Sequence, residues 1–246
     1  GCTNNGNIVG PYRVGGMVGY VYASNSTAYV DIQFCQQNGN LTYGRVAGGS
    51  ATATHDYCGP FVAYSNSPFT TIKYCIDTGT ITLRDNAITA NDGKSFVGLS
   101  SADGSQYDIT SVYVLNKEQY KWLTYASSDD YIANRYEIST AEGIFVTTLE
   151  DIKSGKVAYL INEASLNDEY DSAAGFETFN VEDYAWAGFT TENMFSFGQK
   201  IGTDNAPTPS ISAENWIVLN GDKYANGTKP VEEETTKAPE TTKSPE

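Results

Sequence analysis

Four cysteines are the residues of this sequence best suited to chemistry, because a thiol can form a disulfide, hold a soft metal or act as a nucleophile. Three of them, Cys2, Cys35 and Cys75, are each followed four residues later by glycine and two further on by isoleucine or leucine. Cys58 stands outside this pattern. The shared spacing predicts that the three thiols occupy one position of a repeat. We favour small, buried, reduced thiols that pack internally, with a disulfide between neighbouring repeats as the alternative.

The sequence contains few other candidates for catalysis or cofactor binding. His55 is its sole histidine and no Cys-x-x-Cys pair occurs, which argues against a metal site or a histidine-based nucleophile, and no cofactor is expected. Paired carboxylates stay possible among its 30 acidic residues. Asp31 and Asp108 fall at like positions of the repeat, but Thr71 is expected to stand between them, which favours a solvated face.

The cysteine pattern belongs to a longer repeat. A glycine-rich phrase precedes two of the three cysteine phrases, at residues 14–20 and 58–64. A fainter copy at residues 96–98 and 108–110 has lost its cysteine. A unit this short cannot bury its own apolar face, so successive units must stack on one another.

Alternating apolar and polar residues predict short strands within each repeat, as at residues 32–35 and 72–75. The glycine after each cysteine, Gly39 or Gly79, is expected to supply a turn with positive φ. We therefore predict a mainly β fold: a right-handed parallel β-solenoid of degenerate repeats over residues 1–116, with strands stacked about 4.8 Å apart.

A region of different composition follows over residues 117–227. Residues 147–155 predict a short capped helix closed by glycine, and residues 156–162 predict further helical turns. Residues 197–207 read as an extended stretch, and residues 216–224 as a β-hairpin on an Asn-Gly turn. We expect a small α+β cap that covers the open end of the solenoid, where strand edges would otherwise stay unpaired.

The repeats resemble the GLUG repeat of bacterial secreted and cell-surface proteins, which include immunoglobulin A peptidases. The stretch after residue 196 resembles the C-terminal part of the same proteins, with Phe197 where tryptophan is usual, whereas Pro60 and Ala63 depart from the repeat pattern. The resemblance implies structural roles, with Gln199 and Asp204 bonding to turns and backbone. The matching positions are Gly15, Gly16, Gly19, Gly59, Gln199, Gly202, Asp204 and Pro207.

Charge and composition restrict the function further. A formal net charge of -15 argues against binding nucleic acid or an anionic membrane surface, and no apolar run is long enough to insert in a membrane. Residues 228–246 contain mainly Thr, Pro, Glu and Lys and predict a disordered linker. Because the chain begins within a repeat, we expect it to be a fragment of a longer precursor.

Together these features predict a non-catalytic module of a bacterial extracellular or cell-surface protein, acting as a spacer or as an adhesive, ligand-binding scaffold. The alternative is an accessory part of a surface peptidase or glycan hydrolase, or an acid-lined solenoid hydrolase. Expected partners are a host or microbial glycan or protein, and flanking modules of the same parent chain. Rings that cover the junction between solenoid and cap are the structural alternative to a binding role. The candidate ligand-binding residues are Tyr120, Trp122, Tyr125, Tyr131 and Trp186.

Overall fold

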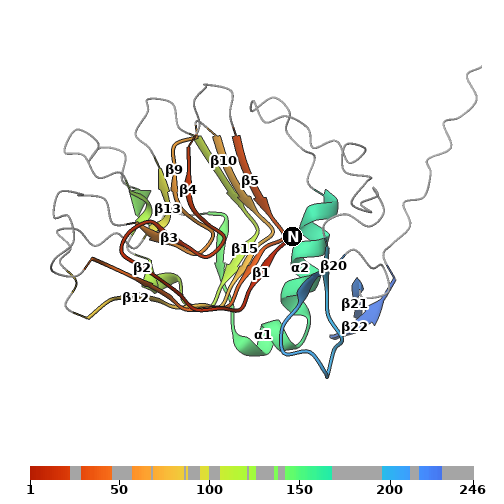
Figure 1. The fold of residues 1–246 in the computed structure, drawn as a ribbon. Helices are drawn as coiled ribbons and strands as arrows, with labels where there is room; N and C mark the ends of the chain where they lie inside the picture. The colour runs from red at the N-terminus through yellow and green to blue at the C-terminus, as the bar shows by residue number, and fades with distance from the viewer. Residues whose placement is uncertain are drawn as a thin grey trace, which may run out of the picture.

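The fold is mainly β, with many short parallel strands stacked into a solenoid and a short helical region near the C-terminal part (Figure 1). His55, Tyr131, Trp186 and the tail after residue 228 lie outside the described residues. The computed structural model describes residues 1–22, 29–45, 57–67, 69–85, 87, 95–99, 106–120, 122–125, 136–137, 142–167, 196–210 and 216–228.

Each turn of the solenoid, called a rung here, contributes one strand to each of several parallel sheets. Sheet A consists of β1 (Thr3–Asn4), β6 (Gln36–Gln37), β11 (Ile76–Asp77), β15 (Val112–Val114) and β18 (Ile144–Val146). Sheet B consists of β5 (Tyr29–Gln33), β10 (Phe69–Lys73) and β14 (Gln106–Thr110). Sheet C consists of β2 (Ile8–Gly10), β7 (Leu41–Tyr43) and β12 (Ile81–Leu83).

The remaining solenoid strands form sheet D and one short pair. Sheet D consists of β4 (Val18–Val21), β9 (Val62–Ser65), β13 (Ser95–Leu99), β16 (Trp122–Tyr125) and β17 (Tyr136–Glu137), of which β17 alone runs antiparallel to its neighbour. The short pair is β3 (Val14–Gly15) with β8 (Cys58–Gly59), and a 3-10 helix, η1, spans Lys117–Gln119. Because β16 and β18 pair with these sheets, the stack continues past residue 116 as far as Val146.

The register of sheet A places the three repeat cysteines on successive rungs, as their spacing predicts. The backbone N–H of Gln36 donates to the carbonyl of Cys2 at 2.8 Å, and that of Ile76 donates to the carbonyl of Cys35 at 2.9 Å. In the next rung the position of Cys75 is taken by Val112. The faint third copy of the repeat is therefore real, with an apolar residue replacing the lost cysteine.

A left-handed backbone residue turns the chain from sheet B into sheet A at the same place in three rungs. Phe34, Tyr74 and Ser111 have φ values of 51°, 54° and 52°. After this corner Cys35 and Cys75 point into the solenoid core, whereas the aromatic residues before them belong to a second core outside it. The predicted positive φ at Gly39 and Gly79 is wrong, because the described glycines with positive φ do not include them.

Close approach between rungs explains the glycines that follow the cysteines. A Cβ on Gly39 would lie against the carbonyl oxygen of Gly6, and one on Gly79 would lie against that of Gly39, in both cases inside van der Waals contact. At Gly6, a Cβ would find its nearest neighbour at 3.5 Å. These three residues, the glycine column, let the backbones of successive rungs pass without a side chain between them.

The C-terminal region, which we expected to cover an open end of the solenoid, packs along the side of the solenoid in its described part. Figure 1 shows α2 beside β1 and β15. The core between them contains Phe34, Tyr74 and Ile76 from two successive rungs, with Tyr113 of the next rung packed against it. We call this region the flank layer. It consists of α1 (Leu149–Lys153), α2 (Lys156–Asn167), β19 (Ser196–Gly198), β20 (Thr208–Ser210), β21 (Trp216–Asn220) and β22 (Lys223–Gly227).

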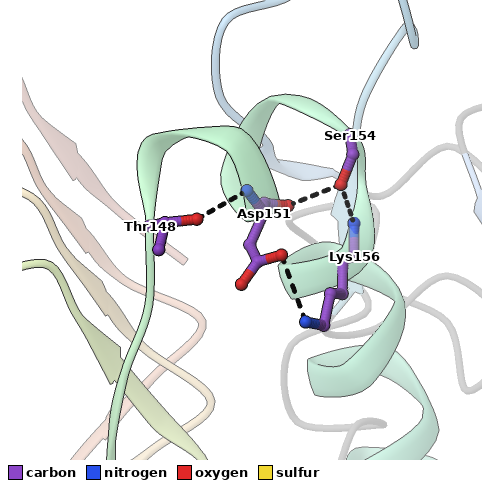
Figure 2. A network of polar contacts seen from close by, with 4 residues as sticks. All are labelled: Thr148, Asp151, Ser154 and Lys156. Carbon is purple, nitrogen blue, oxygen red and sulfur yellow. Dashed lines mark hydrogen bonds and ion pairs between the residues drawn. The ribbon is translucent and has the colours of Figure 1, made fainter.

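A polar network fixes the two helices of the flank layer relative to each other (Figure 2). The hydroxyl of Thr148 accepts from the backbone N–H of Asp151 at 3.0 Å and caps α1, as the sequence predicts. Gly155 ends α1 with a φ of 86°. Lys156 begins α2, where its ammonium contacts the Asp151 carboxylate at 3.1 Å. Helix α2 runs to Asn167, beyond the turns expected at 156–162.

Two further motifs of the flank layer shape its turns. The side-chain amide of Gln199 donates to the carbonyls of Ile152 and Lys153 at the end of α1, at 3.0 and 3.1 Å. The Asp204 carboxylate accepts from the backbone N–H of Lys200 at 2.7 Å. In the hairpin of β21 and β22 the turn residues are Gly221 and Asp222, one position later than the Asn-Gly turn expected, because Asn220 pairs with Lys223.

Candidate functional site

Of the five aromatic residues that sequence suggests as ligand contacts, only Tyr120 has a described side chain. Tyr120 is 2% exposed, so its ring belongs to the solenoid core and presents no face to a ligand. Trp122 and Tyr125 are the end residues of β16, but their side chains lie outside the described part. Tyr131 and Trp186 lie outside it altogether. The described part of this set therefore supports packing at Tyr120.

Tyr120 donates its hydroxyl hydrogen to Asp77, the most deeply buried acid among the described residues. The Asp77 carboxylate also accepts from the backbone N–H of Gly79 at 3.1 Å and from the Gln119 amide at 3.2 Å. Burial raises the pKa of Asp77 to about 7, against the opposing hydrogen bonds from Tyr120 and Gly79. Burial likewise raises the pKa of Tyr120, with the Asp77 charge adding to it.

Asp77 belongs to a column of polar residues inside the solenoid. Its partners in register are Gln37 and Asn4 on the two preceding rungs. Asn4 donates to the Gln37 side chain at 2.8 Å and accepts from the backbone N–H of Gly6 at 2.9 Å. Gln37 donates to the carbonyl of Gly39 at 2.7 Å. Each side chain thus bonds the glycine-containing turn of its own rung, which assigns the column a structural role.

Sheet B carries two carboxylates, those of Asp31 and Asp108, at the same position of the repeat. Asp31, Thr71 and Asp108 are aligned on successive rungs, as expected. The prediction of a solvated face is wrong at the middle rung, because Thr71 is 5% and Lys73 9% exposed.

Lys73 connects this face electrostatically. Its ammonium contacts the Asp108 carboxylate at 2.9 Å, and Thr110 donates to the other oxygen of that carboxylate at 2.8 Å. The Asp31 carboxylate accepts two bonds of 2.9 Å from the Gln33 amide. Burial nevertheless raises the pKa of Asp31, and the Lys73 charge opposes that rise. The face of sheet B thus combines Asp31, whose carboxyl is harder to ionise, with Asp108, whose carboxylate is paired with Lys73.

Sheet D carries a tyrosine cluster that sequence analysis missed. Tyr20 and Tyr64 are register partners in β4 and β9, and their ring centroids lie 5.4 Å apart. The ring of Tyr22 lies 6.2 Å from Tyr20, and that of Tyr57 lies 4.7 Å from Tyr64. The Arg13 guanidinium carbon lies 4.2 Å from the centroid of Tyr20 and 4.8 Å from that of Tyr64.

The tyrosine cluster combines buried support with exposed rings. Tyr57 is buried, whereas Tyr20 is 41% and Tyr22 70% exposed. Arg13, in contact with both the Tyr20 and the Tyr64 ring, holds these rings in place and adds a positive charge beside them. The repeat contains a signal for this cluster, since Tyr20 and Tyr64 occupy one position of the two glycine-rich phrases. Chemically, adjacent exposed rings next to a guanidinium suit the apolar faces and hydroxyl groups of sugars.

Metal and membrane sites are not found in the described part of the chain. Within it, no group of three or more His, Cys, Asp or Glu side chains is arranged to hold a metal ion. No helix among the described residues has both the length and the apolar composition needed to cross a bilayer.

Comparison of the chain with protein families, curated proteins and solved structures gives no match. The fold itself defines the class as a parallel β-solenoid with a lateral α+β layer. The resemblance to GLUG repeats stays a prediction from sequence.

Proposed function

We propose that this chain is a non-catalytic module of a bacterial secreted or cell-surface protein, and that it is an adhesive scaffold that binds glycans through the tyrosine cluster. The observation that carries the proposal is the pair of register-matched rings, Tyr20 and Tyr64, with Arg13 against both. A solenoid is suited to this role because its rigid backbone fixes the spacing of side chains on successive rungs.

Two properties support a glycan as the ligand. Tyrosine rings bury much apolar area while their hydroxyl groups stay available for hydrogen bonds, and they lose little conformational entropy on binding. The chain has a net charge of -15, which disfavours polyanions such as nucleic acids and anionic lipid surfaces. A neutral or weakly charged carbohydrate therefore fits the cluster better than a polyanion does.

The surface location and the flanking modules are part of the same proposal. They depend on the GLUG-like repeats and on the composition of residues 228–246, which is typical of a Thr/Pro-rich linker between modules. In this arrangement the solenoid is also a spacer that holds its ligand site away from the anchoring part of the parent chain.

We expect the variant Tyr20→Ala/Tyr64→Ala to bind glycans at least about tenfold more weakly than the unchanged chain, because each ring contributes roughly 1 kcal/mol of stacking. The measurement is a glycan-array screen followed by calorimetric titration of the best ligand. Phe145→Ala is the matched control, since Phe145 is also an exposed ring stacked on a neighbour, Tyr113, but in sheet A.

Equal loss of affinity in the Phe145→Ala control would mean that the effect is not specific to the cluster. Full binding by the double variant, with its thermal midpoint unchanged, would rule out the cluster as the binding site. If the unchanged chain bound no glycan on the array, the proposal that it is a glycan-binding scaffold would be wrong.

A second candidate function is an acid-lined hydrolase on the face of sheet B. It is favoured by the raised pKa of Asp31 together with Asp108, two rungs away at about 9.6 Å along the stack. This spacing is near that of the two carboxyl groups in inverting glycosidases. The hydrolase candidate requires that Asp31→Asn and Asp108→Asn each reduce polysaccharide hydrolysis at least about 100-fold, whereas Asp222→Asn in the exposed hairpin leaves it unchanged. Because we propose a scaffold, we expect no turnover by the unchanged chain in the same assay.

A further inference from the structure

The strongest feature left unexplained is the column of thiols on the N-terminal rungs. Cys2, Cys35 and Cys75 follow one another in register, and each is a free thiol. Neighbouring rungs of a parallel sheet are about 4.8 Å apart, which lies within the Cα separation that disulfides span. The column therefore places each pair of adjacent thiols close to bonding distance.

Accessibility differs along the column. Cys2 is exposed, Cys35 is 6% exposed and Cys75 is fully buried. A reagent from solvent therefore meets Cys2 first. Cys35 is the next thiol in register, so it is the nearest internal thiol to a mixed disulfide formed at Cys2.

Each pair of thiols would need a small adjustment to form a bond. In-register side chains of parallel strands point the same way, so a disulfide requires the sulfurs to move slightly closer than the strand spacing. Strand β1 has two residues and pairs in sheet A with β6 only. By contrast, β6 and β11 each pair with strands on both sides. Among the described residues, Cys35 therefore precedes the strand that joins the rung of Cys2 to the rung of Cys75.

The environment of Cys35 favours its thiolate, which is the reactive form. The neighbouring Cys75 side chain lowers the pKa of Cys35 to about 6, against the rise that burial causes. Burial, the largest cause, raises the pKa of Cys75, which therefore stays protonated, and its thiol donates to the carbonyl of Lys73 at 3.0 Å. Cys75 also lies close to the backbone of Cys35, with its sulfur 3.4 Å from that residue's nitrogen.

We propose that Cys2 and Cys35 form a reversible disulfide between two rungs, by exchange with a low-molecular-weight disulfide. The Cys2 thiolate attacks one sulfur of the small disulfide, which gives a mixed disulfide and releases one small thiolate. The Cys35 thiolate then attacks the Cys2 sulfur, forms the new S–S bond and releases the second small thiolate. The two cysteines lose two electrons and two protons in total, and the small disulfide is reduced to two thiols.

The structure assigns Cys75 a positioning role in this exchange. Its sulfur accepts from the backbone N–H of Cys35 at 3.4 Å, which keeps it next to Cys35, and it does not itself enter the disulfide. Cys58, which is buried outside the column, takes no part. The site would make the rungs of Cys2 and Cys35 responsive to the thiol–disulfide balance of their surroundings.

The test is to incubate the full chain with glutathione disulfide and to map its disulfides by mass spectrometry of non-reduced peptides. We expect a Cys2–Cys35 link, formed equally fast in Cys58→Ser. In Cys75→Ala, ring closure at pH 7 should slow by about tenfold and its pH midpoint should rise, because Cys35 loses the neighbouring side chain that lowers its pKa. Cys75→Ser keeps a donor and should restore much of the rate.

Several results would overturn the proposal. They are a Cys35–Cys75 link, glutathione retained on Cys2 with no internal link, or the same closure rate and pH midpoint in Cys75→Ala as in the unchanged chain. Circular dichroism of each variant before incubation separates these results from a failure to fold. None of them bears on glycan binding, which is measured at a different sheet.

Discussion

Replacing Gly39 with alanine is expected to lower the free energy of unfolding by about 3 kcal/mol. The new Cβ would lie against the carbonyl oxygen of Gly6 on the preceding rung, inside van der Waals contact, and the obstacle is backbone that cannot rotate away. The rungs would have to separate locally, which would weaken the hydrogen bonds of sheets A and C beside it. Urea denaturation followed by circular dichroism measures the loss.

Gly6→Ala is the control that the glycine column itself provides. Gly6 occupies the same repeat position, but a Cβ there would meet its nearest described neighbour at an ordinary 3.5 Å. We expect this variant to change the free energy of unfolding by less than about 1 kcal/mol. Similar losses for Gly6→Ala and Gly39→Ala would show that flexibility, rather than close approach between rungs, explains these glycines.

Replacing Asp77 with asparagine is expected to remove a large part of the pH dependence of stability. The pKa of Asp77 is about 7 in the folded chain because of burial, against an ordinary value of 3.8. The folded state therefore holds this proton more tightly than the unfolded state does. The stabilisation is complete below about pH 4 and is lost as pH rises through about 7, by roughly 4 kcal/mol in all.

Asparagine suits this position because Asn4 occupies it two rungs earlier, with the same bond from a glycine N–H. The measurement is the difference in unfolding free energy between the unchanged chain and Asp77→Asn at pH 4.5 and at pH 8. We expect the variant to gain relative stability as pH rises, whereas Asp151→Asn, at a partly exposed ion pair, follows the unchanged chain. A pH-independent difference for Asp77→Asn would mean that its carboxyl titrates normally in the folded chain.

Repeat spacing was sufficient to predict the stack, because in a solenoid one position of the repeat becomes one column of side chains. The cysteines, the pair Asp31 and Asp108, and the faint copy ending in Val112 all fall into the predicted register. Position in a column is thus encoded locally. The repeat spacing does not predict in the same way which residues adopt the left-handed backbone conformation.

The corner between sheets B and A illustrates this limit. Its left-handed residues are Phe34, Tyr74 and Ser111, types that carry no signal for positive φ. Gly39 and Gly79, five positions after Phe34 and Tyr74, carry that signal but are required for close packing instead. Residue type alone cannot distinguish a glycine required for a positive φ from a glycine required because another backbone segment packs closely against it.

The same corner explains why the flank layer lies along the side of the solenoid, a position that the sequence did not predict. Phe34 and Tyr74 precede the cysteines, and their residue types continue the alternation predicted for a half-buried strand. In the structure the corner points them outward, where Phe197 and the helices cover them. The tyrosine cluster was missed for a different reason. The repeat aligns Tyr20 with Tyr64, but the contact of Arg13 with both rings does not follow from the repeat.

The flank layer affects how the molecule unfolds. In a simple solenoid each coil touches only its neighbours, so terminal coils can fray one at a time while the rest stays folded. Here one helical layer packs on side chains from successive coils, including Phe34, Tyr74 and Tyr113. Peeling away a single coil would strip part of that shared surface as well. Melting should therefore be concerted, with the lateral layer joining otherwise independent coils into one cooperative unit.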